Sequence, residues 1–507
     1  MKIRAAYQTR LLIGLVIALF GLLRLRLMYL PILDIGLPTP VGTDAAVHLT
    51  MITKILHGEQ HLFVDGYPQG FHYLVAGLVR LTGLSPVSMV VGLMPLLALA
   101  SVAAIGYLAW VVAGGRAALI TVLLSLTVTV YPLSGFLDGT YPNLLAGALL
   151  APLCLAFFLQ SLRRETTPQL LGFLMIGLAI IVTHHLTAAW LSCLMALFFM
   201  ILAIRDIVIN RQPARSFFGR KIVWLSGGLL ILTGLIYWPI LIGPLLARRV
   251  VGGSLASVFG SYLSHPLGFG QYREFIGDIP WALGGIGLAW LVAGRSPVGK
   301  YERLLLVLWT LFLFLLSRSS WVGLPSRFAR ELALPLLLIS AIWLAEISRQ
   351  ITGRWQMLGA TAVFFTFVVM NLVGLQTAPV FPDQVLPLVT FSRANADTAQ
   401  LISELLPEGA VVLTTPATPV WSVLAQRTMI PLEVNETKTP ETITETIART
   451  KATYLLLIPK PESNPAEEVY PYLAHFATVK EQLSTYPHKV FARGFSDGSL
   501  LFRVSPT

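Results

Sequence analysis

Residues 86–113 read PVSMVVGLMPLLALASVAAIGYLAWVVA and contain no charged side chain. A helix of about 20 mostly apolar residues crosses the hydrocarbon core of a bilayer, so this stretch predicts a transmembrane helix. The composition agrees, because 55% of the 507 residues are hydrophobic and only 12% are charged, which is too apolar for a soluble globular protein. We therefore predict a polytopic α-helical membrane protein.

Similar apolar runs recur as far as residue 378, and the basic loops between them indicate orientation, because cytoplasmic loops gather Lys and Arg. Lys2, Arg4 and Arg10 place the N-terminus in the cytoplasm, and the basic connection 205–221 lies on the same side. About eleven spans fit between these anchors. We therefore expect a protein integral to the plasma membrane, with its C-terminus on the extracytoplasmic side. We expect the spans near 11–30, 86–113, 117–133, 143–162, 168–184, 186–204, 222–246, 280–294, 304–317, 331–348 and 357–378. The formal charge of +11 therefore reports orientation, and we expect no nucleic-acid partner.

Two regions do not read as spans. The segment 71–84 (FHYLVAGLVRLTGL) is short and holds His72 and Arg80, so we expect a helix on the outer membrane surface. It closes a long outer loop, 31–85, within a transmembrane domain of residues 1–379. After that domain, strand-like runs such as GAVVLTT and GSLLFRV alternate with helix-like stretches. We expect residues 380–507 to form a small extracytoplasmic α/β domain.

This topology brings residues that hydrocarbon disfavours to one membrane face. We predict a site there, at the boundary between water and lipid, with one catalytic carboxylate and a set of substrate-binding side chains. The predicted catalytic residue is Asp44, and the predicted substrate-binding residues are His48, His72, Asp138, Tyr141, His184, His185, His265, Arg318, Arg327 and Arg330.

Asp44 lies in VGTDAAVHL, residues 41–49, four residues before His48, so the two positions share one face of a helix. A carboxylate at this place would accept the proton of an attacking hydroxyl, which is the work of a general base. The alternative is structural, because Thr43 and Asp44 both suit the N-cap of a helix.

The other acidic and imidazole groups have structural alternatives too. Asp138, in GFLDGTYPN, suits a turn as well as a substrate contact. His184 and His185 form the tip of a hairpin, where adjacent side chains point about 100° apart and do not chelate by themselves. They either bind substrate or join two helices as hydrogen-bonded polar groups. His265 belongs to the loop 251–279, whose aromatic, charged and glycine residues are typical of a lid or an acceptor-binding loop, and also of any long outer loop.

No cofactor is firmly predicted. A divalent metal is possible, but no D-x-D pair supports it.

Three arginines stand in SRSSWVGLPSRFARELALP, residues 317–335, although cytoplasmic loops are where arginines gather. Arginines on the outer side suit an anion, and the planar guanidinium matches a phosphate group well. The alternative is that Glu331 neutralises Arg327 or Arg330 in ordinary salt bridges.

These features together resemble the GT-C superfamily of polytopic glycosyltransferases that use polyprenyl-phosphate-linked sugars. The likeness rests on VGTDAAVHL after the first span, the following YPQGFHYLVAGL, the loop LDGTYPN, the late outer RFARELALP and the C-terminal domain. The chain lacks the W-W-D-type signature of oligosaccharyltransferases and looks closer to the protein mannosyltransferases and arabinosyltransferases.

The resemblance implies an inverting reaction on the extracytoplasmic face. Asp44 would deprotonate or orient an acceptor hydroxyl of a glycan, lipid or protein, and Arg327, with Arg330 beside it, would stabilise the departing lipid phosphate. The alternative from another functional class is a transporter or flippase of lipid-linked saccharides, which would place its ionisable groups near the bilayer midplane.

Overall fold

The computed structural model describes residues 14–26, 29, 43–58, 63–64, 67–127, 131, 139–211, 217–238, 267–294, 296–319, 325–350, 393–415, 421, 425–431, 441–459, 486 and 489–504. The predicted span 357–378 and the predicted site residues Asp138 and His265 lie outside the described residues, as does the side chain of Asp44.

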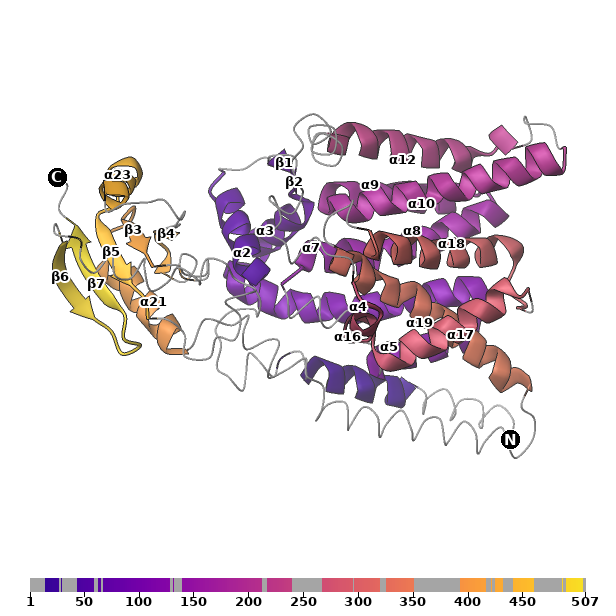
Figure 1. The fold of residues 1–507 in the computed structure, drawn as a ribbon, viewed down its shortest axis with the longest axis horizontal. Coiled ribbons are helices and arrows are strands. Elements are labelled where there is room, and N and C mark those ends of the chain that lie inside the picture. The colour runs from indigo at the N-terminus through magenta and orange to yellow at the C-terminus, as the bar shows by residue number, and fades with distance from the viewer. Residues whose placement is uncertain are drawn as a thin grey trace.

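Helices form most of the described chain and run roughly parallel to one another in Figure 1. The hydropathy of the sequence placed these helices close to their observed positions, although α19 (Pro325–Gln350) begins before the expected residue 331. Four helical stretches among the described residues are long and apolar enough to cross a membrane: Pro86–Ala113, Tyr141–Arg163, His185–Ile209 and Pro325–Gln350. The polytopic helical membrane fold is therefore confirmed, whereas the count of eleven spans stays a prediction. The helices are α4 (Pro86–Ala113), α5 (Gly115–Thr127), α7 (Tyr141–Asn143), η1 (Leu144–Leu150), α8 (Ala151–Arg163), α9 (Thr167–Thr183), α10 (His185–Ala203), η2 (Ile204–Ile209), α12 (Lys221–Tyr237), α16 (Tyr272–Ile276), α17 (Asp278–Val292), α18 (Lys300–Ser317) and α19 (Pro325–Gln350).

Local signals in the sequence explain where α4 begins and ends. Ser85 caps its start, because its Oγ accepts a hydrogen bond of 3.1 Å from the backbone N–H of Ser88, and Pro86 suits the first helical position. Gly114 ends it with a φ of +85°, a backbone conformation that costs glycine little. The chain can then reverse directly into α5.

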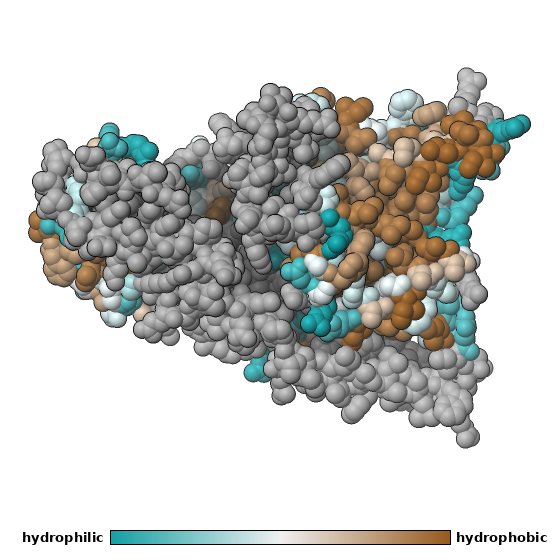
Figure 2. All heavy atoms as spheres, viewed as in Figure 1, coloured by the Kyte–Doolittle hydropathy of each residue, from teal (hydrophilic) through white to brown (hydrophobic). Residues whose placement is uncertain are grey.

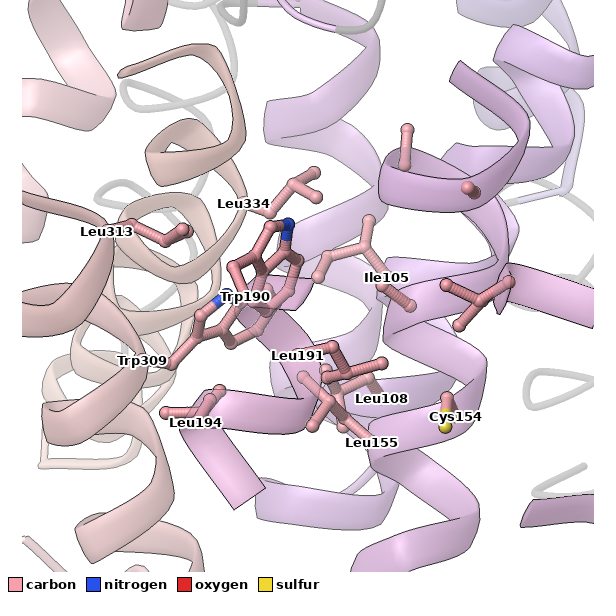
Figure 3. Close-up of a cluster of buried hydrophobic side chains, with 14 of the residues drawn as sticks. Ile105, Leu108, Cys154, Leu155, Trp190, Leu191, Leu194, Trp309, Leu313 and Leu334 are labelled. Atoms are coloured by element: carbon pink, nitrogen blue, oxygen red, sulfur yellow. The ribbon is translucent and has the colours of Figure 1, made fainter. Parts of the chain in front are cut away.

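A stack of two tryptophans marks the packed core between α10 and α18. The rings of Trp190 and Trp309 lie 6.2 Å apart and within 13° of parallel, and Figure 3 shows Leu334 of α19 beside them. On the far side of α19, Gly284 and Gly287 of α17 leave no room for a Cβ against that helix, the close approach that small residues allow in membranes. The core therefore holds α10 and α19, which carry site residues, in a fixed relation.

Two short helices cover one end of this helical body. They are α2 (Thr43–Leu56) and α3 (Gly70–Thr82), joined through the strands β1 (Phe63–Val64) and β2 (Tyr67–Pro68). The 13 residues of α3 are too few to cross a bilayer by themselves, and its place on the membrane surface stays a prediction. Arg80 ties the two together by donating to the Leu56 carbonyl at the end of α2, at 3.2 Å.

A five-stranded sheet follows the helical body in the chain, with the order β4-β3-β5-β7-β6. The strands β4, β3 and β5 are parallel, and β7 and β6 are antiparallel to their neighbours. In Figure 1 the sheet lies beyond α2 and α3, away from the other end of the helical body. Its elements are α21 (Arg393–Leu405), β3 (Val411–Thr414), β4 (Thr428–Pro431), α23 (Glu441–Thr450), β5 (Tyr454–Leu457), β6 (Lys489–Gly494) and β7 (Leu500–Val504).

The surface of the helical body suits a membrane. Figure 2 shows a broad hydrophobic area over the helices and hydrophilic residues at the end far from the sheet. Exposed apolar side chains include Leu235 at 74% and Trp224 at 67%, which water would disfavour and lipid accommodates. On α18, the buried carboxylate of Glu302 pairs with Arg163 of α8 at 2.6 Å.

Candidate functional site

A cavity of about 240 Å³ opens where α2, α7, α10 and α19 approach one another. Its polar lining comes from segments far apart in the chain, and Arg327 is the one permanently charged side chain among the described lining residues. The lining residues are Val47, His48, Met51, Tyr67, Thr140, Pro142, Asn143, His184, His185, Leu186 and Arg327. Four of the predicted site residues, His48, His184, His185 and Arg327, therefore meet at one place.

The imidazoles of His48 and His72 form a buried pair beside this cavity. Nδ1 of His48 lies 2.9 Å from Nε2 of His72, and one ring donates to the other. The rings of Phe71 and Tyr141 lie within about 6 Å of His48. Burial lowers the pKa of His48 to about 3, with the charge of Arg327 adding to the effect, and burial followed by the charge of His48 lowers the pKa of His72 to about 2. Both rings are therefore neutral near pH 7 and act through hydrogen bonds.

His184 and His185 have different surroundings, as their adjacency in the chain predicts. His184 caps the start of α10, where its Nδ1 accepts a hydrogen bond of 3.3 Å from the backbone N–H of Thr187. His185 instead contacts the rings of Tyr67 and Tyr237, with centroids 5.4 Å and 6.1 Å away. The described residues contain no group of three or more His, Cys, Asp or Glu side chains arranged to hold a metal ion.

The three predicted outer arginines separate in space. Arg327, near the start of α19, lines the cavity. Arg330 lies over the ring of Phe275 at 5.6 Å. Arg318 donates to the carbonyl of Leu267 and lies over the ring of Phe269 at 5.2 Å, outside the cavity lining. Of the three, Arg327 has the position that a ligand in the cavity would contact.

A buried polar network behind the cavity was missed by the sequence analysis. The hydroxyl of Thr187 on α10 lies 3.2 Å from Oε1 of Glu331 and 3.3 Å from Oδ1 of Asn143. It also lies 2.8 Å from Nδ1 of His184. Glu331 is only 3% exposed and forms no ion pair with an arginine among the described residues. The available signal was an acidic residue, Glu331, at the start of the apolar run ELALPLLLIS, where the sequence also suits a salt bridge to a nearby arginine.

The predicted base lies at the start of α2. The helix begins at Thr43, which places Asp44 in its first turn, and the neighbouring backbone of Ala45 is in close contact with Gly139. Asp44 thus belongs to the helix that supplies Val47, His48 and Met51 to the cavity. Its role, like those of Asp138 and His265, stays a prediction.

Comparison with known proteins identifies the fold. No family model and no curated protein sequence matches this chain. Among solved structures, the Archaeoglobus fulgidus oligosaccharyltransferase is similar with a TM-score of 0.60 and 12% identity, over 97% of this chain and 74% of that one. ArnT from Cupriavidus metallidurans is similar with a TM-score of 0.59 and 15% identity, over 99% of both chains. The mycobacterial arabinofuranosyltransferase AftD is similar with a TM-score of 0.52 and 14% identity, over 97% of this chain and 41% of that one.

All three are GT-C glycosyltransferases, so this chain has the GT-C fold that its motifs predicted. Identities this low establish the fold alone. The TM-scores to the oligosaccharyltransferase and to ArnT are nearly equal. The overall fold therefore does not separate the oligosaccharyltransferase branch from the other branches, as the missing W-W-D-type signature was expected to do.

Proposed function

We propose that this protein is a membrane glycosyltransferase that moves a sugar from a polyprenyl-phosphate donor to an acceptor hydroxyl on the extracytoplasmic face. The observation that carries the proposal is the polar cavity with Arg327 in its lining, set at one end of a helical body that has the GT-C fold. The proposal includes the division into a transmembrane domain, residues 1–379, and an extracytoplasmic domain, residues 380–507. The acceptor is a glycan, a lipid or a protein.

The solved structures support the choice of donor. One archaeal oligosaccharyltransferase structure contains a dolichol-phosphate and an inhibitory peptide, and one ArnT structure contains undecaprenyl phosphate. Both ligands carry a phosphate on a long isoprenoid chain. A cavity lined by an arginine, at the end of a membrane-embedded helical body, suits the same chemistry. These comparisons do not favour the alternative of a saccharide transporter.

The proposed reaction is a single displacement at C1 of the donor sugar. Asp44 takes the proton of the acceptor hydroxyl as its oxygen bonds to C1, and the bond between C1 and the phosphate oxygen breaks. The electron pair of that bond leaves with the lipid phosphate, where Arg327 stabilises the new charge. One attack from the side opposite the leaving group inverts the configuration at C1.

Two features of the described site support these roles. Position 44 precedes Val47, His48 and Met51 by three, four and seven residues, which in a helix is the face that lines the cavity. The low pKa of His48, about 3, keeps its imidazole uncharged near pH 7. It can therefore bind sugar hydroxyls without competing with Arg327 for the phosphate.

The test uses the purified protein in lipid with a panel of polyprenyl-phosphate sugars and crude membrane extract as acceptor source. Release of polyprenyl phosphate is measured for the wild type, Asp44→Asn and Arg327→Ala. Arg349→Ala is the matched control, because Arg349 lies at the opposite end of the same helix and is exposed. We expect one donor to turn over and both site variants to lose at least about 100-fold in rate, with the control near wild type. Release from no donor, or full activity in both site variants, contradicts the proposal.

A further inference from the structure

The side-chain amide of Asn143 holds a buried hydrogen-bond donor for which the described residues supply no acceptor. Asn143 lines the cavity and is 1% exposed. Its Nδ2 has no hydrogen-bond partner among the described residues. A buried donor left unpaired has a cost in stability, and native proteins leave few such groups. An acceptor supplied by a ligand in the cavity would remove this cost.

The other end of the amide is held by the protein. Oδ1 accepts a hydrogen bond of 3.3 Å from the hydroxyl of Thr187. A Cβ at Gly147, one turn further along, would come within 2.8 Å of Oδ1 and 2.5 Å of Oε1 of Glu331. Only a glycine lets these oxygens pack so closely against the helix backbone. The oxygen of the amide therefore faces the Thr187 network, and its NH₂ group remains available as a donor.

The backbone at Asn143 is itself unusual. Asn143 ends the short helix α7 and is followed directly by the π-helical segment η1, over Leu144–Leu150. Segments of π-helix occur often at functional sites, because they change the direction in which side chains leave the helix. Here the segment lies within the candidate span Tyr141–Arg163, directly after the cavity-lining residues 140, 142 and 143.

We propose that Asn143 donates a hydrogen bond to the phosphate group that Arg327 binds, and that Thr187 is the positioning residue that orients it. Arg327 lines the same cavity and supplies the positive charge, while a neutral N–H donor supplies direction. Donors fixed before the reaction stabilise a developing phosphate charge without rearranging. This inference rests on the proposed function and adds a second phosphate-binding group to it.

The test measures the affinity of the full-length protein in detergent for undecaprenyl phosphate, which carries the phosphate and no sugar. The variants are Asn143→Ala, Asn143→Asp and Thr187→Val. Asn210→Asp, a substitution of the same kind at the exposed residue that follows η2, is the matched control. We expect about a tenfold weaker Kd for Asn143→Ala and for Thr187→Val. Asn143→Asp should bind at least about 100-fold more weakly than wild type, because its carboxylate repels the phosphate.

The order of the two Asn143 variants separates a phosphate contact from a packing role. Aspartate has nearly the shape of asparagine but brings a carboxyl group beside Glu331, so the melting temperature of each variant is measured as well. A residue needed only for packing would lose phosphate affinity only in step with its loss of melting temperature. Binding by Asn143→Asp that equals or exceeds binding by Asn143→Ala overturns the inference. Unchanged undecaprenyl phosphate affinity in all variants also overturns it, and if turnover of the sugar donor still falls, the amide contacts the sugar. A wild-type protein that binds no undecaprenyl phosphate instead refutes the proposed function itself, and the inference with it.

Discussion

Gly139→Ala tests whether the start of α2 belongs to the reaction centre. A Cβ built on Gly139 would lie 2.4 Å from the backbone N of Ala45, whereas ordinary contacts begin at 3.4 Å. Because the obstacle is backbone, no side-chain rotation relieves it, and either the Gly139 segment or the first turn of α2 must move by about 1 Å. Asp44 immediately precedes Ala45. A displacement of about 1 Å at a catalytic group costs on the order of 100-fold in rate, or about 2.7 kcal/mol of activation free energy.

The backbone conformation of Gly139 adds a second effect that needs its own control. Its φ is +74°, where an alanine costs about 1–2 kcal/mol. Gly83 has a φ of +71° with no atom within 4 Å of a built Cβ. Gly83→Ala therefore carries the same backbone penalty without the contact. Both variants should lose thermal stability through this backbone penalty, Gly139→Ala more because of its added contact, and only Gly139→Ala should lose activity.

The assay is kcat/KM for release of polyprenyl phosphate, together with the melting temperature of each purified variant. We expect kcat/KM about 100-fold below wild type for Gly139→Ala and close to wild type for Gly83→Ala. Wild-type kcat/KM in Gly139→Ala would refute the reasoning, because the start of α2 would then be free to move without affecting the reaction. An equal loss in both variants would show that strain, and not displacement, is responsible.

Two further predictions concern stability. Trp309→Ala removes the stack on Trp190 between α18 and α10 and should lower the free energy of unfolding by about 3–5 kcal/mol. Leu315→Ala, on the same helix but 64% exposed, should change the melting temperature much less. Similar losses of melting temperature in both variants would contradict the assignment of Trp309 to the core. The lowered pKa values of His48 and His72 mean that the unfolded chain gains protons below pH 6.5 while the folded protein does not. Stability should be full above pH 6.5 and fall as the pH drops toward 3, by about 1.4 kcal/mol per pH unit for each histidine. A melting temperature that does not fall between pH 6.5 and pH 5 would count against two buried neutral rings.

Hydropathy and loop charge were enough to locate the membrane helices, because the bilayer sets both their length and their composition. The start of α19 was missed because its first turns do not have the apolar composition of a membrane span. Its first turns contain Arg327, Arg330 and Glu331, and a hydropathy scale rejects such residues even when they face a cavity or another helix. The helix in fact begins at Pro325, six residues before the expected start at residue 331.

The sequence was enough to name several residues of the candidate site, but not to show which of them line the cavity. His48, His184 and Arg327 were named from their residue types and expected membrane face, and the fold brings them into one cavity. Arg318 was named for the same reason and lies outside that lining, because the sequence alone does not show which of the three arginines lies at the cavity. Asn143 was missed because its partner Thr187 is 44 residues away in the chain. Contacts of this kind exist only after the helices have packed.

The Thr187 network also bears on the biogenesis of the protein. It joins residues 143, 187 and 331, which a ribosome delivers to the membrane in that order and far apart in time. Until the helix carrying Glu331 has been inserted, the hydroxyl of Thr187 lacks one of its partners and the cavity lacks Arg327. A half-synthesised chain therefore has no assembled cavity, and a fragment that ends before α19 lacks both Arg327 and Glu331.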